Sequence, residues 1–326
     1  MNIKARMYWC LMCCAFLTLP LPAVAKEIPY PIRPLRLIVP FAPGGSADVP
    51  ARLLANALTN QMGHQIVVDN RSGAGGIIAA ETAAKAQADG YTILLGSIGM
   101  LTIIPNLKKS LSYNPDIDFL PVSMLSATPT IIVVHPKLGV QSVRELISLA
   151  NSKPGAISFG SSGTGSSTHL SGELFKSMAK VDLAHVPYKG AALAVLDLVS
   201  GQILLGFDTL ASLAHVRSGR LKALAISTSN RSVLLPDVPT VAESGVPGYE
   251  TSSWNGVMLP ASTSKEIANR LYMEIVKAIA IPDVRDRMQA NGNTPRSSTP
   301  LEFKKFIGEE RMRWGKLIKE ANIQVE

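Results

Sequence analysis

The sequence has very little cysteine. Of its 326 residues only Cys10, Cys13 and Cys14 are cysteines, and all three lie close to the N-terminus. The 301 residues that follow Ala25 contain none. If the chain is cut after Ala25, as the N-terminal pattern below predicts, then disulfide bonds, cysteine nucleophiles and thiolate metal sites are excluded from the mature protein.

Long apolar runs and clusters of like charge are also missing. A membrane-spanning helix needs about 20 apolar residues; the stretch at 7–21 is shorter, and no later segment approaches that length. Without Lys4 and Arg6, 30 basic residues remain against 24 acidic ones. No run of five basic residues and no basic-aromatic array occurs, so we expect no nucleic-acid partner. The mild positive balance weakly favours acidic small ligands.

The chain lacks the motifs of common hydrolases and nucleotide-binding proteins. No Gly-x-Ser-x-Gly, His-Glu-x-x-His or Gly-Lys-Ser/Thr motif occurs, and residues 163–168 lack the third glycine of the dinucleotide fingerprint. The Ser-x-x-Lys match at 262–265 has none of its usual partner motifs, and helix capping is its more natural role. We therefore predict a protein that is not an enzyme and that has no cofactor and no metal site.

The N-terminus has the three parts of an export signal in the right order. Lys4 and Arg6 give a positive start, residues 7–21 are apolar, and Ala23 and Ala25 frame a small-x-small cleavage site. This predicts a signal peptide at residues 1–25 and a periplasmic mature chain. A lipoprotein, lipidated on Cys14, is the alternative, although the bulky residue before Cys14 fits it poorly.

Beyond residue 35, short apolar runs alternate with helical stretches, which predicts an α/β fold with a largely parallel sheet. We expect strands at 35–41, 65–69 and 91–95. Each of them is followed by a loop that contains glycine and serine. Ligands bind outside the carboxyl ends of strands in open parallel sheets. The three loops should therefore converge on one site.

Two proline-rich passages divide the pattern. The passage at 105–129 precedes a renewed series of strands and helices, and the passage at 236–248 precedes a strand and three C-terminal helices. Two crossings of this kind predict a hinged clamshell with a ligand cleft between its lobes. We predict one lobe from residues 26–126 and 251–326, and a second from residues 127–250, each with a mostly parallel sheet flanked by helices.

Two glycine-rich loops could hold an anion. Gly44 and Gly45 let the backbone approach a ligand just before a helix N-terminus, although a tight turn capped by Ser46 or Asp48 explains them equally simply. Residues 160–168 offer many hydroxyl and N–H groups with little bulk; a flexible linker is the alternative. His169 follows this loop at a helix start. Asp208 ends an apolar strand, where it could accept from a ligand ammonium or from water, or cap a helix.

Several long motifs occur in a fixed order along the chain. They lie at residues 39–48, 51–52, 70–76, 89–92, 118–122, 159–170, 185–190, 235–240 and 248–250, with Trp254. In this order they resemble the Bug-type solute receptors, the extracytoplasmic binding component of tripartite tricarboxylate transporters. The resemblance covers nearly the whole mature chain. It implies a two-lobed periplasmic binding protein of the clamshell, type II-like class.

The resemblance also implies a ligand and a set of binding residues. The ligand would be a small carboxylate: a dicarboxylate or tricarboxylate, an acidic amino acid or an aromatic acid. Backbone groups, hydroxyls and ordered waters would hold it, without a dedicated arginine. The first lobe would contribute Phe41, Gly44, Gly45, Ser46, Asp48, Gly75 and Ser97, although residues 96–100 depart from any fixed pattern. The second lobe would contribute Ser161, Ser162, Gly165, Ser166, His169, Tyr188 and Asp208.

The partners follow from the same resemblance. We expect a monomer that delivers its ligand to the membrane permease subunits of a tripartite tricarboxylate transporter. The alternative is a periplasmic sensor that docks on a membrane signalling partner, and an exported hydrolase is a more distant one. The sequence does not separate transport from sensing, and it does not identify the carboxylate.

Overall fold

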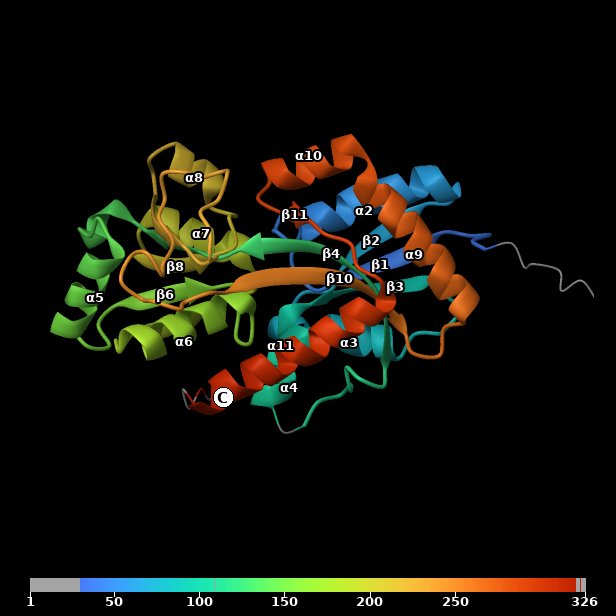
Figure 1. Ribbon diagram of the computed structural model, residues 1–326, viewed down its shortest axis with the longest axis horizontal. Helices are drawn as coiled ribbons and strands as arrows, with labels where there is room; N and C mark the ends of the chain where they lie inside the picture. The colour runs from blue at the N-terminus through green and yellow to red at the C-terminus, as the bar shows by residue number, and fades with distance from the viewer. Residues whose placement is uncertain (1–29, 109, 321–322, 324–326) are drawn as a thin grey trace, which may run out of the picture. The chain divides into compact units, whose positions relative to one another are not determined.

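The computed structural model describes residues 30–108, 110–320 and 323 (Figure 1). The predicted signal peptide at 1–25, with the alternative lipidation site at Cys14, lies outside these residues. Residues Pro31–Glu326 form one compact unit. Among the helices described, none is both long enough and apolar enough to cross a membrane.

The first sheet has six strands in the order β11-β4-β10-β3-β1-β2. Its strands are β1 (Leu35–Val39), β2 (Ile66–Asn70), β3 (Thr92–Ser97), β4 (Phe119–Pro129), β10 (Ser252–Pro260) and β11 (Thr294–Pro295). Strand β1 runs parallel to β2 and β3, whereas β10 is antiparallel to both β3 and β4. The three strands expected from the N-terminal part of the sequence thus lie side by side, with β1 in the middle.

The second sheet has five strands in the order β7-β6-β8-β5-β9. Its strands are β5 (Ile131–Val134), β6 (Ser158–Ser161), β7 (Ala184–Pro187), β8 (Leu205–Asp208) and β9 (Lys222–Ile226). Strand β6 pairs in parallel with β7 and β8, and β5 pairs antiparallel with β8 and β9. All five come from the middle of the chain. The lobe boundaries at 126/127 and 250/251 stay a prediction.

The α/β class is confirmed, but the expectation of mostly parallel sheets is wrong, because both sheets are mixed. The cause is the crossing segment. Only Thr130 separates β4 from β5, so this nearly continuous stretch adds an antiparallel strand to each sheet, and β10 returns antiparallel to β4. The sequence predicted a crossing at 105–129, and the structure adds that residues 119–129 of this passage form strand β4. Its Pro121 lies where the register with β10 shifts, and such irregularities tolerate a residue without an N–H.

Helices cover both faces of the first sheet (Figure 1). On one side lie α2 (Asp48–Met62), α9 (Lys265–Ala280) and α10 (Pro282–Ala290), and on the other α3 (Ile77–Ala84), α4 (Ile104–Leu107) and α11 (Pro300–Glu320). Helix α11 buries Phe303, Ile307, Trp314 and Ile318, a spacing that places them on one helical face. A capping box opens this helix, since the Glu302 N–H donates to Thr299 Oγ1 and the Thr299 N–H donates to Glu302 Oε2.

The second sheet is covered in the same way. Helices α5 (Val143–Ser152) and α6 (Ser167–Ala179) contribute to one apolar core, and α7 (Ala191–Ser200) and α8 (Leu213–Arg217) to another. Each of α2, α6 and α7 is the next helix after a parallel strand, β1, β6 or β7. A helix in this position begins near the carboxyl end of its strand, so its N-terminus is available at the ligand-binding edge of the sheet.

Candidate functional site

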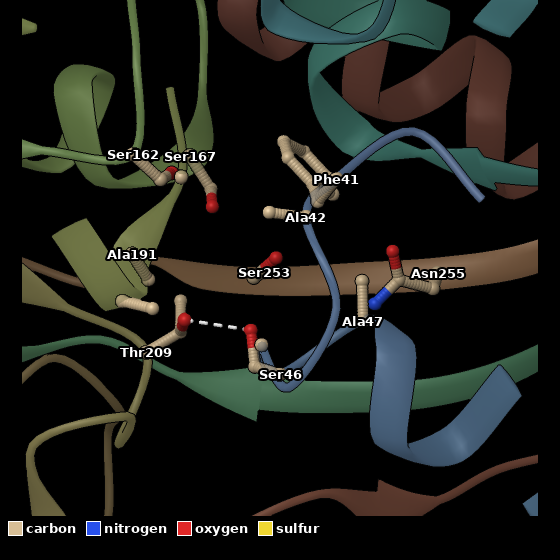
Figure 2. A pocket seen from close by; sticks show the side chains of 13 residues that line it. Phe41, Ala42, Ser46, Ala47, Ser162, Ser167, Ala191, Thr209, Ser253 and Asn255 are labelled. Atoms are coloured by element: carbon tan, nitrogen blue, oxygen red, sulfur yellow. Dashed lines mark hydrogen bonds between the residues drawn. The ribbon is translucent and has the colours of Figure 1, made fainter. Parts of the chain in front are cut away.

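A cavity lies between the loop that follows β1 in the first sheet and the loops that follow β6, β7 and β8 in the second (Figure 2). It holds about 470 Å³ of empty space, the part open to solvent included. Strand β10 contributes one wall. The lining residues are Phe41, Ala42, Gly45, Ser46, Ala47, Ser162, Ser167, Gly190, Ala191, Ala192, Thr209, Ser253 and Asn255.

Three helix N-termini meet at this cavity. Ala47 is the N-cap of α2, Ser167 is the first residue of α6, and Gly190 is the N-cap of α7. Backbone N–H groups in the first turn have no acceptor inside their own helix, and the aligned peptide dipoles place a partial positive charge there. None of the lining residues carries a charged side chain. The cavity is therefore suited to an anion that is bound by N–H groups and hydroxyls.

The loop before α2 presents several N–H groups. Gly44 has φ +81°, a conformation that favours glycine, and its N–H donates to Asp48 Oδ2 at 2.9 Å. In the described part of the chain, the N–H groups of Gly45, Ser46 and Ala47 donate to no protein acceptor. These groups are available to a ligand.

Asp48 fixes the shape of that loop rather than lining the cavity. Its buried carboxylate accepts from Gly44 N–H, from Arg52 Nε at 2.8 Å and from Asn70 Nδ2 at 2.8 Å. The same Asn70 Nδ2 donates to the carbonyl oxygen of Phe41. Burial alone raises the pKa of the Asp48 carboxyl, but these hydrogen bonds outweigh burial and lower it. Asp48 is thus ionised and ties both ends of the loop together.

A hydrogen bond spans the cavity from one sheet's loops to the other's. Ser46 Oγ, in the loop after β1, lies 2.7 Å from Thr209 Oγ1, which directly follows β8 (Figure 2). The two residues are 163 positions apart in the sequence. Their contact joins the opposite walls of the cavity at one end.

The second glycine-rich loop is held by its own hydroxyls. Thr168 Oγ1 accepts from the Ser162 N–H at 2.9 Å and lies 3.0 Å from Ser166 Oγ. Ser166 is the N-cap of α6, since its Oγ accepts from the His169 N–H. The predicted cradle is therefore an ordered loop whose hydroxyls mostly bond one another.

Two stacked histidines lie beneath this loop. The rings of His169 and His185 are 4.0 Å apart, and both nitrogens that face the loop are bonded: Gly165 N–H donates to His169 Nδ1, and Ser161 Oγ lies 2.6 Å from His185 Nε2. Burial lowers the pKa of His169 to about 3 and that of His185 to about 4. Both imidazoles are neutral near pH 7, and their contacts with Gly165 and Ser161 hold the loop in place.

The structure places the predicted site residues in four groups. Phe41, Gly45, Ser46 and Ser162 line the cavity. Gly75 and Tyr188 line a neighbouring cavity that shares Phe41 and Ser162 with it, and Gly165 lines a third. The remaining predicted residues, which are Gly44, Asp48, Ser97, Ser161, Ser166, His169 and Asp208, are not among the lining residues of these cavities. Direct contact of the ligand with any of them stays a prediction.

Asp208 and Tyr188 both have protein partners. Asp208 Oδ2 accepts from the N–H and the hydroxyl of Ser212, both at 2.7 Å, and burial raises the pKa of this carboxyl. The Tyr188 hydroxyl donates to Asp197 Oδ2 at 2.8 Å, and burial together with Asp197 raises the pKa of this hydroxyl to about 12. The N-cap of α8 is Ser212, so the helix-cap role left open for Asp208 is wrong, and its carboxylate instead organises the turn that leads into α8.

Sequence reasoning missed most of the cavity wall from α7, β8 and β10. Ala191 and Ala192 begin a helix and Thr209 directly follows a strand, so position in the strand-loop-helix pattern could have indicated them. Ser253 and Asn255 carried no such signal, because they lie within a strand near the far end of the chain. Only the pairing of β10 between β3 and β4 brings them to the site.

Replacing Asp48 should loosen the loop before α2. We expect Asp48→Ala to lower the free energy of unfolding by about 2 kcal/mol. The change removes the carboxylate that accepts from Gly44, Arg52 and Asn70 and leaves these donors without that acceptor. Chemical denaturation measures this. Glu81→Ala is the matched control: it removes the exposed ion pair with Lys85 and should cost less than about 0.5 kcal/mol. Equal effects of the two changes would contradict the assigned role of Asp48.

The histidine pair should make the fold sensitive to mild acid. Both folded-state pKa values lie below the ordinary value of 6.5, so the unfolded chain binds more protons as pH falls below 6.5. The stabilisation is complete above pH 6.5 and is lost as pH falls toward 4, by up to about 1.4 kcal/mol per pH unit for each histidine. Denaturation of the protein and of His185→Gln between pH 7.5 and 5 measures the slope, which should be smaller in the variant. Equal slopes would contradict the account.

Comparison with known proteins places the chain in one family. Residues 50–323 match the family described as "Tripartite tricarboxylate transporter family receptor". The chain is 40% identical to protein BugT of Bordetella pertussis over 91% of its own length and 92% of that protein.

Solved structures of related proteins agree with the sequence comparison. A protein of R. palustris solved with adipate is 38% identical, with a TM-score of 0.88, over 90% of this chain and 99% of that one. The periplasmic binding protein BugD is 32% identical, with a TM-score of 0.87, over 91% of this chain and all of that one. The two-lobed fold predicted from the ordered motifs is confirmed, and the chain belongs to the tripartite tricarboxylate transporter receptor family, whose members are solute-binding receptors and not enzymes.

Proposed function

We propose that this protein is a periplasmic receptor that binds a small carboxylate in the cavity between its two sheets and delivers it, unchanged, to the permease subunits of a tripartite tricarboxylate transporter. One observation carries the proposal: the N-termini of α2, α6 and α7 meet at a cavity whose lining has hydroxyls but no charged side chain. The carboxylate would accept hydrogen bonds from these N–H groups.

Helix N-termini can supply enough attraction without an arginine. Each offers N–H donors and a partial positive charge of roughly half an elementary charge, and hydrogen bonds to a carboxylate are about twice as strong as neutral ones. The attraction is strongest in a recess from which water is displaced. A carboxylate in contact with two or three of these helix ends would then gain from each, while an uncharged ligand of the same shape would not.

The wider comparisons support the same class of ligand and location. The R. palustris relative has adipate, a dicarboxylate, in its structure, and BugD is described as a periplasmic protein. The export signal predicted at residues 1–25 agrees with that location.

Contacts across the cavity suggest how binding would favour a closed state. The Ser46–Thr209 bond joins its walls, and a Cβ added at Gly99 would lie 2.9 Å from the Gly165 carbonyl oxygen, so the two sheets' loops approach closely there. A ligand that touches groups from both sheets stabilises the arrangement in which they are together. The permease would then distinguish the loaded receptor from the empty one by its closure.

A single charge at the start of α7 should test the anion site. We expect Ala191→Asp to lower the affinity for a carboxylate about 100-fold or more, because the new carboxylate repels the ligand across a few ångströms. An acidic residue in a first turn favours the helix, so stability should be kept. Ala191→Asn is the matched control of equal size without the charge, and its effect should be several-fold at most.

The measurement is calorimetric titration with succinate, citrate, glutamate and benzoate, supported by melting temperatures. The wild-type protein should bind at least one of these and should not bind the corresponding amide. Two results would contradict the proposal. One is a wild-type melting temperature that none of the four acids changes, and the other is equal affinity in the Asp and Asn variants.

A further inference from the structure

Three buried polar side chains lie side by side in the first sheet without a hydrogen-bond partner. In the antiparallel register, Asn255 of β10 is directly opposite Ser97 of β3 on one side and Ser126 of β4 on the other. Their exposed fractions are 2%, 3% and 0%. Within the described residues, Asn255 Oδ1, Ser97 Oγ and Ser126 Oγ have no partner. Buried polar atoms of this kind are rare, and each calls for an explanation.

The three side chains point to the same face of the sheet. Residues directly opposite each other in antiparallel strands share a face, with Cβ atoms about 4.5–5.5 Å apart. Asn255 lines the cavity beside Ala47, the N-cap of α2, so this face is the one that the cavity reaches. Figure 2 shows Asn255 on β10 with its amide nitrogen turned toward Ala47. The amide oxygen of Asn255 is buried, and the residues on either side of Asn255 in the sheet are the two serines.

A neighbouring pair of residues on β10 and β4 includes a buried hydroxyl that does have a partner within the protein. Two positions along, Ser253 of β10 is opposite Thr128 of β4. The Thr128 hydroxyl donates to Asn293 Oδ1 at 2.8 Å, so this buried hydroxyl is satisfied inside the protein. The sheet therefore supplies a partner for a buried hydroxyl at Thr128 and supplies none for the row of Ser97, Asn255 and Ser126.

We propose that Asn255 determines ligand specificity: its amide N–H donates to an acceptor oxygen on the ligand, while Ser97 and Ser126 act as positioning residues whose hydroxyls donate to Asn255 Oδ1 in the bound state. This inference rests on the proposed function and narrows it. Two serine donors on the oxygen fix the amide orientation, so that only N–H groups face the cavity. The group recognised is then a hydroxyl, carbonyl or second carboxylate oxygen.

The same geometry disfavours an amino acid as ligand. An ammonium group has donors only, and beside Asn255 it would meet an amide N–H and the positive end of α2. No acidic side chain is among the residues that line the cavity. Asp208, which the sequence suggested as an acceptor for a ligand ammonium, already accepts two hydrogen bonds from Ser212. Of the ligand classes that the sequence left open, acidic amino acids are the one that this site rejects.

The test uses ligand pairs that differ only in this group: malate against aspartate, 2-hydroxyglutarate against glutamate, and adipate against 2-aminoadipate. Calorimetric titration of the wild-type protein should give at least tenfold tighter binding of the member without the ammonium, since an ammonium buried there without an acceptor costs about that factor or more. Asn255→Asp, which has the same shape but an acceptor in place of the donor, should shift the preference toward the amino acid by at least tenfold.

Ser97→Ala and Ser126→Ala separate positioning from structure. Because these hydroxyls have no partner among the described residues, their removal should leave the melting temperature equal or higher, yet weaken binding of the preferred ligand by about tenfold for the pair of changes. Thr128→Val is the matched control. It removes a bonded hydroxyl on the same face, so it should lower the melting temperature and leave the affinity unchanged.

Each outcome decides between the two proposals. Equal binding of both members of every pair, an unchanged preference in Asn255→Asp, or a lower melting temperature without lower affinity in the serine variants would overturn the specificity role. Binding of an aromatic acid but of no aliphatic pair would also overturn it, while the proposed function survives. If the wild-type protein binds no carboxylate at all, both proposals fail.

Discussion

The candidate site depends on one constraint: the first turn of a helix has N–H groups that its own backbone cannot satisfy. In this protein three such turns, at the starts of α2, α6 and α7, face one small cavity. Each helix is the next helix after a parallel strand, so the strand-loop-helix pattern itself brings the N-termini to one edge. The loops are short and rich in glycine, which lets the backbone, rather than long charged side chains, form the wall.

The charged and titratable groups near the cavity hold the loops that form it and do not line it themselves. Asp48 ties the loop before α2 to Asn70 and Arg52, and the stacked His169 and His185 hold the loop before α6. None of these five residues lines the cavity. A formal charge among the lining residues would compete with the ligand or bind it at a single point. Neutral walls on two sheets would instead require a ligand that satisfies both at once, and this is how the proposed function links occupancy to closure.

The sequence predicted the parts of this site that depend on local pattern. The glycines at 44 and 45 and the glycine-rich loop at 160–168 both lie where a strand passes into a helix, and the structure has both transitions. The roles of individual side chains were harder to predict. An aspartate at a helix start can contact a ligand or cap a loop, and only the position of Asn70, on a neighbouring strand, decides for Asp48.

The parts that sequence could not supply depend on pairing between distant segments. Asn255 reaches the cavity because β10 lies between β3 and β4, and Thr209 meets Ser46 across 163 residues. The mixed sheets have the same origin. Strand β4 continues almost directly into β5, and the chain later returns to the first sheet as β10. No periodic pattern within one segment encodes that arrangement. The prolines of β4 also made this strand hard to predict from the sequence. Its irregular pairing with β10 accommodates Pro121.

The most direct measurement of the central claim is a crystal structure of the protein with a bound carboxylate from the titrated panel. The account predicts carboxylate oxygens within about 3 Å of backbone N–H groups at the starts of at least two of the helices α2, α6 and α7. It also predicts that no arginine or lysine side chain contacts the carboxylate. A carboxylate paired with Lys189 in the neighbouring cavity, or bound away from all three helix starts, would contradict it.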